Sequence, residues 1–458
     1  MKNSNLIISY LIVVLSALLY YYTGYELERT SFITLVLIWV SLFGGSYYLI
    51  AKSSFDFFQL SFFGIAFRII LLLVIPNLSQ DFYRFIWDGR ILFEGINPYL
   101  SKPETFIAEG ITPVSQAQEL FNGMGELNAS HYTNYPPFSQ FCYWIAALFA
   151  NESILGSVLI MRLQIILADI GILLIGSKLL ILLKLPVKNI FYYILNPFII
   201  LELTGNLHFE AVMALFLVLS LYLLFKNKWI WAAVTLGISV SVKLIPLLFL
   251  PVFLYYFWRK PNNKLTVNRF LKFIAFCLIV VLTNLILFAP FLSKQFISNF
   301  AETIGLWFQN FEFNASIYYI IRWIGYQVKG WNIIGDVGKI LPIVVIFVTL
   351  VISLFRKNEQ PKILLQSLLF TICSYLLLST TVHPWYLTIP LLLSVFTNYK
   401  FVWIWTITVI LSYYAYAQPD FKENLRLVSL EYLVVVGFFA WEFFLRDQSR
   451  VLSLKSKR

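Results

Sequence analysis

Long apolar stretches follow one another along most of this chain, separated by shorter polar segments. Most are near the roughly 20 residues that a helix needs to cross the hydrocarbon of a bilayer. Barrel strands would alternate between apolar and polar residues, which these stretches do not. The pattern therefore predicts an all-α polytopic membrane protein with about 11 to 13 transmembrane helices. The stretches that carry this prediction are 6–22, 33–50, 60–75, 154–183, 211–225, 273–292, 341–355, 363–378, 401–417 and 430–445.

Composition agrees with this fold class. Of the 458 residues, 60% are apolar and 12% are charged, and the mean hydropathy is +0.78. The net charge of +11 would fit a nucleic-acid binder, but the cations flank apolar stretches in separate groups and form no single patch. We therefore expect membrane lipid, and no nucleic acid, as a partner. The three cysteines lie far apart in apolar stretches, so the sequence indicates neither a disulfide framework nor a metal cluster.

The placement of charge predicts the orientation of the chain. Segment 258–272 carries five basic residues and no acid, and the tail 446–458 carries five basic residues and one acid. Both are expected to be cytoplasmic, including the C-terminus, because basic loops stay on the inner side of the membrane. By contrast, the loop at about 77–135 holds seven acidic and three basic residues and is expected outside.

A second outer loop is predicted at about 293–336. It is rich in aromatic residues, which suit the depth of the lipid headgroups, and both outer loops have room for short interfacial helices. The N-terminal apolar stretch has no small-x-small cleavage pattern and is expected to be a retained first span. Residues 1–458 are accordingly predicted to form a single integral membrane domain.

Two topologies fit the chain between the first outer loop and residue 258. If every apolar stretch crosses fully, the polar residues at 202–210 lie on the cytoplasmic side, away from Asp81. If residues 229–258 instead form two short helices that meet at Lys243 and Pro246, the polar residues return to the outside. We favour this second version, because proline breaks helices and because two nearby pairs of lysines then fall inside.

The most charged stretch of the chain, 80–90, directly follows an apolar one. If it is helical, Asp81, Arg84 and Asp88 share one face. A carboxylate held near a cation stays ionised, and at the membrane surface it can act as a general base toward a sugar hydroxyl. The same spacing equally fits an intrahelical salt-bridge ladder that only orders the loop.

A second polar group lies at Glu202, Asn206, His208 and Glu210. Ionisable residues between apolar stretches are costly in lipid and by default indicate a functional site. Glu202, Asn206 and Glu210 share a helical face if no break intervenes. The alternative is a polar turn whose side chains cap helix ends. A zinc site is not supported, because the three histidines are far apart in sequence.

Two further polar residues interrupt apolar stretches. Lys243 is the one charge in its stretch and needs a counterion, which a lipid phosphate would supply; the alternative is that it extends to the interface. His383 lies in a turn rich in hydrogen-bond donors, where it would hold a phosphate or a hydroxyl. The alternative there is an interfacial aromatic anchor.

Five groups of residues occur in a characteristic order: 81–90 with 95–99, 134–137, 196–210, 243–246 and 383–386. Each alone is weak, but together they resemble the bacterial membrane mannosyltransferases of the GT-C superfamily. The resemblance covers residues 80–386.

This resemblance implies a GT-C-like bundle that transfers a sugar from a polyprenyl-phosphate donor, with mannose as the expected sugar. The acceptor would be a glycan or a lipid-linked glycan, the anomeric centre would be inverted, and the active site would face outside at the bacterial cytoplasmic membrane. In the family an acid of the first outer loop acts as the base, a role that Asp81 matches, with Asp88 as the second acid of the motif.

The remaining site residues are expected to bind substrate. Arg84, Arg90, Lys243 and His383 would meet the donor phosphate, and Glu202, Asn206, His208 and Glu210 would line the substrate site. The family often begins its motif with two adjacent acids, whereas this chain has Gln80 before Asp81. No metal ligand or cofactor is assigned for that reason, and a divalent cation is left open.

Two other classes of function fit the same features. A polymerase or ligase of polyprenyl-linked glycans would use similar substrates on the same side of the membrane. A flippase or transporter of lipid-linked sugars would explain the many spans, but the chain shows no pair of matching helix halves and has an unusually long acidic outer loop.

Overall fold

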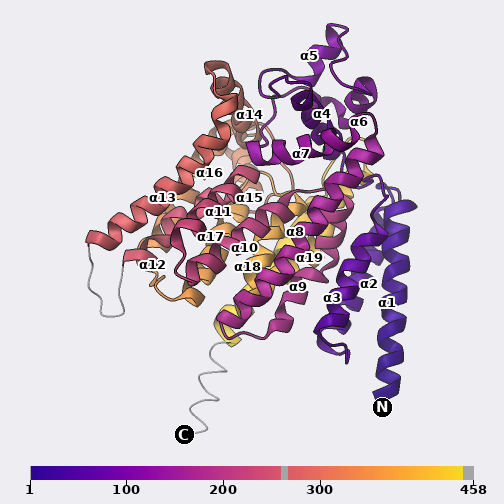
Figure 1. The fold of residues 1–458 in the computed structure, drawn as a ribbon, viewed down its shortest axis with the longest axis vertical. Coiled ribbons are helices and arrows are strands. Elements are labelled where there is room, and N and C mark those ends of the chain that lie inside the picture. The colour runs from indigo at the N-terminus through magenta and orange to yellow at the C-terminus, as the bar shows by residue number, and fades with distance from the viewer. Residues whose placement is uncertain (1, 259–266, 447–458) are drawn as a thin grey trace.

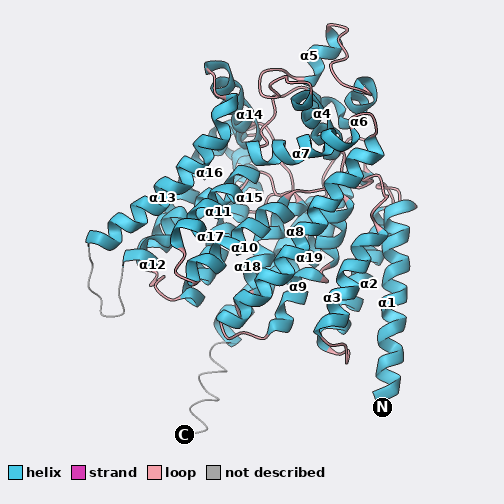
Figure 2. Cartoon of the chain, viewed as in Figure 1, coloured by secondary structure: helices cyan, strands magenta, loops and turns pink. Residues whose placement is uncertain are grey.

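The computed structural model describes residues 2–258 and 267–446, which form a bundle of helices (Figure 1). Helices and loops account for this whole part of the chain, as Figure 2 shows. Pairing of extended backbone is confined there to an isolated bridge between Phe313 and Thr381. The predicted all-α fold is therefore confirmed.

The helices of the described chain have the following bounds. The α-helices are α1 (Lys2–Tyr25), α2 (Phe32–Ala51), α3 (Phe57–Ile70), α4 (Asp81–Phe93), α5 (Pro103–Ala108), α6 (Ala117–Ala129), α7 (Pro137–Ala150), α8 (Ile154–Leu182), α9 (Phe191–Ile194), α10 (Glu210–Phe225), α11 (Trp229–Val242), α12 (Leu254–Trp258), α13 (Val267–Phe288), α14 (Lys294–Gln309), α15 (Ile317–Lys329), α16 (Ile334–Phe355), α17 (Pro361–Leu378), α18 (Thr388–Val395), α19 (Phe401–Thr408) and α20 (Leu425–Ala440). The shorter 3-10 and π helices are η1 (Val187–Ile190), η2 (Ile199–Gly205), η3 (Ile245–Phe253), η4 (Ala289–Phe291), η5 (Pro384–Leu387), η6 (Val409–Ala417) and η7 (Trp441–Arg446).

Seven helices of the described chain are long and apolar enough to cross a membrane, namely α1, α2, α8, α13 with η4, α16, α17, and α20 with η7. The bent pair of η2 and α10 makes an eighth if it is counted as one span. Five further apolar helices are shorter: α3, α11, η3 with α12, η5 with α18, and α19 with η6. The chain is thus a polytopic helical membrane protein. The predicted 11 to 13 spans require that most of the short helices cross as well.

The two predicted outer loops both contain short helices. The first holds α4, α5 and α6, and the second holds α14 and α15. Figure 1 shows α4 to α6 and α14 at one end of the bundle, while the start of α1 lies at the opposite end. Most of the basic segment 258–272 and almost all of the basic tail lie outside the described residues.

Two helix breaks decide how the bundle is folded around its polar residues. Between η2 and α10 the chain bends by 113°. Glu210 therefore begins a new helix and does not continue the face of Glu202. The second break is at Lys243, whose backbone is extended between α11 and η3. The chain thus forms two short helical segments here, α11 and η3 with α12, as the proline at position 246 led us to predict.

A buried arginine satisfies the backbone at the first break. A bend within lipid leaves carbonyl groups without helical partners, and each unsatisfied group is costly. The guanidinium of Arg162 donates to the carbonyls of Thr204 and Gly205 at 2.7 and 2.9 Å, and to that of Leu72 at 2.8 Å. Arg162 on α8 is fully buried. It therefore fixes the break against α8.

A buried ion pair joins α3 to α8. Arg68 Nε lies 2.7 Å from Asp169 Oδ2, and neither side chain is exposed. Arg68 also donates to the carbonyl of Ile194 at 2.8 Å.

We expect Asp169→Ala to lower the free energy of unfolding by about 3–5 kcal/mol, because it leaves the Arg68 charge buried without its partner. Unfolding of the purified protein in detergent measures this loss. The matched control is the double variant Arg68→Met with Asp169→Leu, which removes both charges and should be much less destabilised. Equal stability of the single and double variants would show that the charge pair is not what holds α3 to α8.

Candidate active site

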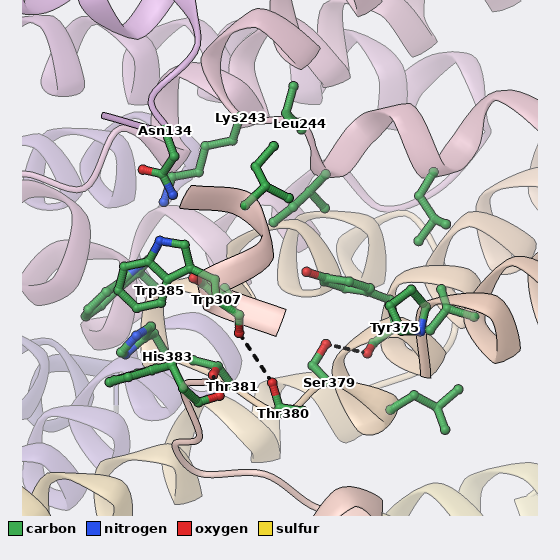
Figure 3. A pocket seen from close by; sticks show the side chains of 18 of the residues that line it. Asn134, Lys243, Leu244, Trp307, Tyr375, Ser379, Thr380, Thr381, His383 and Trp385 are labelled. Atoms are coloured by element: carbon green, nitrogen blue, oxygen red, sulfur yellow. Dashed lines mark hydrogen bonds between the residues drawn. The ribbon is translucent and has the colours of Figure 1, made fainter. Parts of the chain in front are cut away.

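A cavity of about 830 Å³ opens among the helices below α4. Part of its lining consists of charged and aromatic side chains. The largest apolar part, called the apolar arm below, comes from the 244–251 segment and from one face of α16. Figure 3 shows Asn134, Lys243, His383 and Trp385 among the side chains that line it. The cavity therefore suits a molecule with a polar head and an apolar tail. Its polar end is formed by Arg29, Asp81, Asn134, Tyr135, Lys243, His383, Trp385, Tyr386 and Tyr416.

Asp81 is the first residue of α4 and faces this cavity. Its Oδ1 accepts a hydrogen bond from Asn128 Nδ2 at 3.3 Å. Burial raises the pKa of Asp81, and the nearby charges of Lys243 and Arg29 and the bond from Asn128 oppose that rise. A carboxylate with a raised pKa is a stronger base than an ordinary one, which is what proton abstraction requires.

Lys243 reaches the same cavity from the second helix break. Its ammonium forms an ion pair with Glu210. Glu210 is the first residue of α10, and its side chain is buried. The ammonium also lies 5.5 Å from the centre of the Tyr386 ring. The two predicted residues Lys243 and Glu210 thus meet, and the charge of Lys243 is largely balanced before any ligand binds.

Arg29 is a cavity residue that the sequence analysis missed. It lies in the turn between α1 and α2, where it looked like one of the many charges that flank spans. Its guanidinium carbon lies 3.3 Å from the centre of the Tyr416 ring. No carboxylate forms an ion pair with it within residues 2–258 and 267–446. Arg29 is therefore the cation at the polar end whose charge remains unbalanced.

His383 also lines the cavity, within a stack of rings. Its imidazole lies parallel to Trp385 at 4.6 Å, and His208 also stacks with Trp385, at 3.8 Å. Burial, together with the nearby charges of Lys243 and Arg29, lowers the pKa of His383 to about 3. His383 is neutral at physiological pH, so it can donate a hydrogen bond to a phosphate but cannot balance its charge.

Three predicted substrate residues lie behind the cavity wall. Glu202 accepts a hydrogen bond from the hydroxyl of Tyr413, and its other oxygen lies 3.5 Å from Asn206 Nδ2. Asn206 Oδ1 accepts from the backbone of Leu78 at 3.3 Å, close to the start of α4. His208 is covered by Trp385 as described above. Glu202, Asn206 and His208 therefore support the wall, and their predicted contact with substrate has no support from this geometry.

Arg84 and Asp88 form the salt-bridge ladder that the sequence left open. Arg84 Nε lies 2.8 Å from Asp88 Oδ1, and both side chains are buried. Arg84 also donates to the carbonyls of Asn128 and His131, while Asp88 Oδ2 accepts from Gln140 at 3.0 Å. Neither residue lines the cavity. Arg84 instead holds Asn128, which in turn binds Asp81.

Arg90 is also used within the loop. Its guanidinium donates to the carbonyl of Ser115 at 2.6 Å and to Gln116 Oε1 at 3.3 Å. It does not line the cavity. The geometry therefore does not support Arg84 or Arg90 at the donor phosphate, or Asp88 as a catalytic acid or base.

The chemistry of the acidic and imidazole groups does not suggest a metal centre. Across the described ranges, no group of three or more His, Cys, Asp or Glu side chains is placed to hold a metal ion. The residues present thus form no donor set for the divalent cation that the sequence analysis left open.

Comparison with known proteins agrees with the resemblance seen in the sequence. The family model for the N-terminal domain of alpha-(1->6)-mannopyranosyltransferases matches residues 12–259, more than half of the chain. This chain belongs to the alpha-(1->6)-mannopyranosyltransferase family. The matched region contains Arg29, Asp81, Glu210 and Lys243, whereas His383 lies beyond it.

One characterised relative is alpha-(1->6)-mannopyranosyltransferase A of Mycobacterium tuberculosis (strain ATCC 25618 / H37Rv). It is 20% identical over 341 residues, which cover 70% of this chain and 62% of the relative. The chain therefore spans less than two thirds of that relative's length.

We expect Asp88→Asn to lower the free energy of unfolding by roughly 1.5–3 kcal/mol, because buried Arg84 loses its charged hydrogen-bond acceptor. Unfolding in detergent measures the change. Asp81→Asn is the matched control: Asp81 has no ion pair in the described chain and burial disfavours its charge, so this variant should be at least as stable as the wild type. If Asp88→Asn were equally stable, the structural role of Asp88 would be wrong.

Proposed function

We propose that this protein is a membrane mannosyltransferase that uses a polyprenyl-phosphate sugar as donor and a glycan or lipid-linked glycan as acceptor. The observation that carries this proposal is the cavity, which joins a carboxylate and two cations to an apolar arm. A polyprenyl-phosphate sugar has the same division into a polar head and an apolar tail. The family to which the chain belongs supports mannose as the sugar.

The apolar arm offers the apolar lining that a prenyl chain requires. On α16, Leu341, Val345 and Thr349 recur every four residues and so line one face of the helix. At 1.5 Å per residue, the lining from Leu341 to Leu350 is roughly 14 Å long. Leu244, Leu247, Leu248 and Pro251 of the 244–251 segment form the opposite wall. A tail in this arm would leave its phosphate near Lys243.

The proposed reaction is a single displacement at the anomeric carbon. Asp81 takes the proton of the acceptor hydroxyl while the hydroxyl oxygen forms a bond to the anomeric carbon. On the opposite face the bond to the phosphate oxygen breaks, and its electron pair leaves with the polyprenyl phosphate. Arg29 and Lys243 stabilise the charge that develops on this phosphate. Attack opposite the leaving group inverts the configuration.

The distribution of lysines supports an active site outside the bacterial cytoplasmic membrane. Arg162, in the first third of α8, contacts the break before Glu210, and the helix continues from there to Leu182. Lys184 and Lys188 follow its far end, and Lys226 and Lys228 follow the far end of α10. Because lysines concentrate on the cytoplasmic side, the cavity is proposed to face the opposite side, with the C-terminus inside.

The direct test is transfer by the purified protein in detergent or nanodiscs, with radiolabelled polyprenyl-phosphate mannose and a mannan acceptor. Label in the acceptor supports the proposal. Transport of the donor across vesicles without transfer would reject it in favour of a carrier, and chain growth from a lipid-linked oligosaccharide donor would favour a polymerase or ligase.

Replacing Asp81 with Asn should reduce kcat by about 10²- to 10⁴-fold, the usual contribution of a general base. Folding and membrane insertion should be unchanged. In the wild type, kcat/KM should fall as the pH drops through the pKa of Asp81, because the base works only when ionised. Burial raises that pKa, so this acidic limb should lie above the ordinary value of about 3.9 for aspartate. Retained turnover in Asp81→Asn would reject the assignment.

Arg29→Gln should raise the KM for the donor roughly tenfold or more, because a charged hydrogen bond to the phosphate is lost. Arg29→Lys should recover part of the affinity. The matched control is Arg356→Gln, since Arg356 also packs over an aromatic ring, Phe370 at 5.0 Å, but lies at the far end of α16 and outside the cavity. Equal KM values for Arg29→Gln and the control would remove Arg29 from the site.

A further inference from the structure

Asn134 offers an unused side-chain amide to the polar end of the cavity. It lines the cavity, as Lys243 does (Figure 3). The two other lining amides are already engaged: Gln80 Nε2 donates to the carbonyl of Met124 at 3.0 Å, and Asn128 Nδ2 donates to Asp81 at 3.3 Å. The Asn134 side chain forms no hydrogen bond within the part of the chain that the structure describes.

The lining serine and threonine hydroxyls are engaged as well. Ser379, Thr380 and Thr381 donate to backbone carbonyls. Thr349 donates to the carbonyl of Val345, and Ser79 accepts from the backbone of Asp81. Asn134 is therefore the lining amide that keeps both its acceptor and its donors for a ligand.

The backbone around Asn134 is held firmly against the break at Lys243. The backbone N–H of Phe138 donates to Ser241 Oγ at 3.2 Å, and Ser139 Oγ donates to the carbonyl of Val242 at 2.7 Å. These bonds join the start of α7 to the end of α11. On the other side, the hydroxyl of Tyr99 donates to the carbonyl of Tyr135 at 2.7 Å. The backbone that carries Asn134 is thus fixed relative to the backbone that carries Lys243.

The surroundings of Trp385 suggest what the Asn134 amide could bind. Sugars commonly stack on the face of a tryptophan, and the Trp385 ring is already stacked with His208 at 3.8 Å and with His383 at 4.6 Å. Hydrogen bonds to the ring hydroxyls distinguish hexoses that differ in the direction of one hydroxyl. A planar amide with a donor beside an acceptor matches two neighbouring hydroxyls.

We propose that Asn134 is a specificity-determining residue that binds two adjacent ring hydroxyls of the donor hexose. This inference rests on the proposed function, in which Arg29 and Lys243 hold the donor phosphate and Asp81 meets the acceptor. A site that hydrogen-bonds a hydroxyl rejects an analogue in which that hydroxyl is absent or points elsewhere, because the polar group of the protein is left unpaired. Asn134 therefore sets which hexose is accepted.

The test compares kcat/KM for polyprenyl-phosphate mannose and polyprenyl-phosphate glucose, using the full chain in nanodiscs. We expect the wild type to prefer one donor. Asn134→Ala should lower the ratio of the two values about tenfold, mainly through a higher KM for the preferred donor, with kcat changed much less. Asn134→Asp keeps the shape of the side chain but removes its N–H donors, so it should lose selectivity as well. The control is Asn122→Ala, an exposed residue of α6.

The outcomes separate the two proposals. An unchanged donor ratio in both Asn134 variants, or an equal loss for the two donors, would overturn the role of Asn134 while leaving the transferase intact. A wild type that does not distinguish the hexoses would also overturn it. Absence of transfer by the wild type from either donor would reject the proposed function itself. Thermal unfolding of each variant identifies any loss that arises from misfolding.

Discussion

The ion pair between Lys243 and Glu210 is the interaction on which the polar end of the cavity depends. Each residue lies at a break in an apolar helix, one before η3 and the other at the start of α10. Within an apolar bundle neither charge is tolerated alone, because an unpaired buried charge costs several kcal/mol. Since each charge needs the other, the pair holds the two breaks together. The helices can thus be interrupted within the bundle while the residues at the two breaks still form an ordered wall of the cavity.

The breaks also require partners for their backbone groups. Arg162 meets the carbonyls of Thr204 and Gly205 after η2, and Asn206 binds the backbone of Leu78 just before α4. These polar side chains lie in the interior and make no contact with the cavity. Sequence analysis expected Asn206 in the substrate site and kept a polar turn that caps helix ends as the alternative, and the hydrogen bond to Leu78 fits that alternative. The structure divides the polar residues into residues that hold the breaks and residues that face the cavity.

Features were predictable from the sequence where the residues next to them in the chain indicate their role. Apolar stretches of span length were recognisable, and Pro246 beside the lone charge of Lys243 indicated the second break correctly. The apolar stretch 60–75 was predicted as a span, but its helix, α3, ends at Ile70. Arg29 could not be found, because in sequence it is one more charge between two spans. Its partner Tyr416 lies near the other end of the chain, and only the fold brings them together.

The first outer loop shows why spacing could not assign roles within the 80–90 stretch. Asp81 and Asp88 lie two turns apart on one helix, yet Asp88 is paired with Arg84 and Gln140 in the interior while Asp81 faces the cavity. At Gly89, an added Cβ would lie 2.3 Å from the carbonyl oxygen of Tyr143, so α4 packs closely against α7. This tight packing, together with the bonds of Arg84 to the α6 end, fixes the start of α4. The charges of this stretch therefore act in two ways: Arg84, Asp88 and Arg90 form contacts that support the loop, and Asp81 faces the cavity.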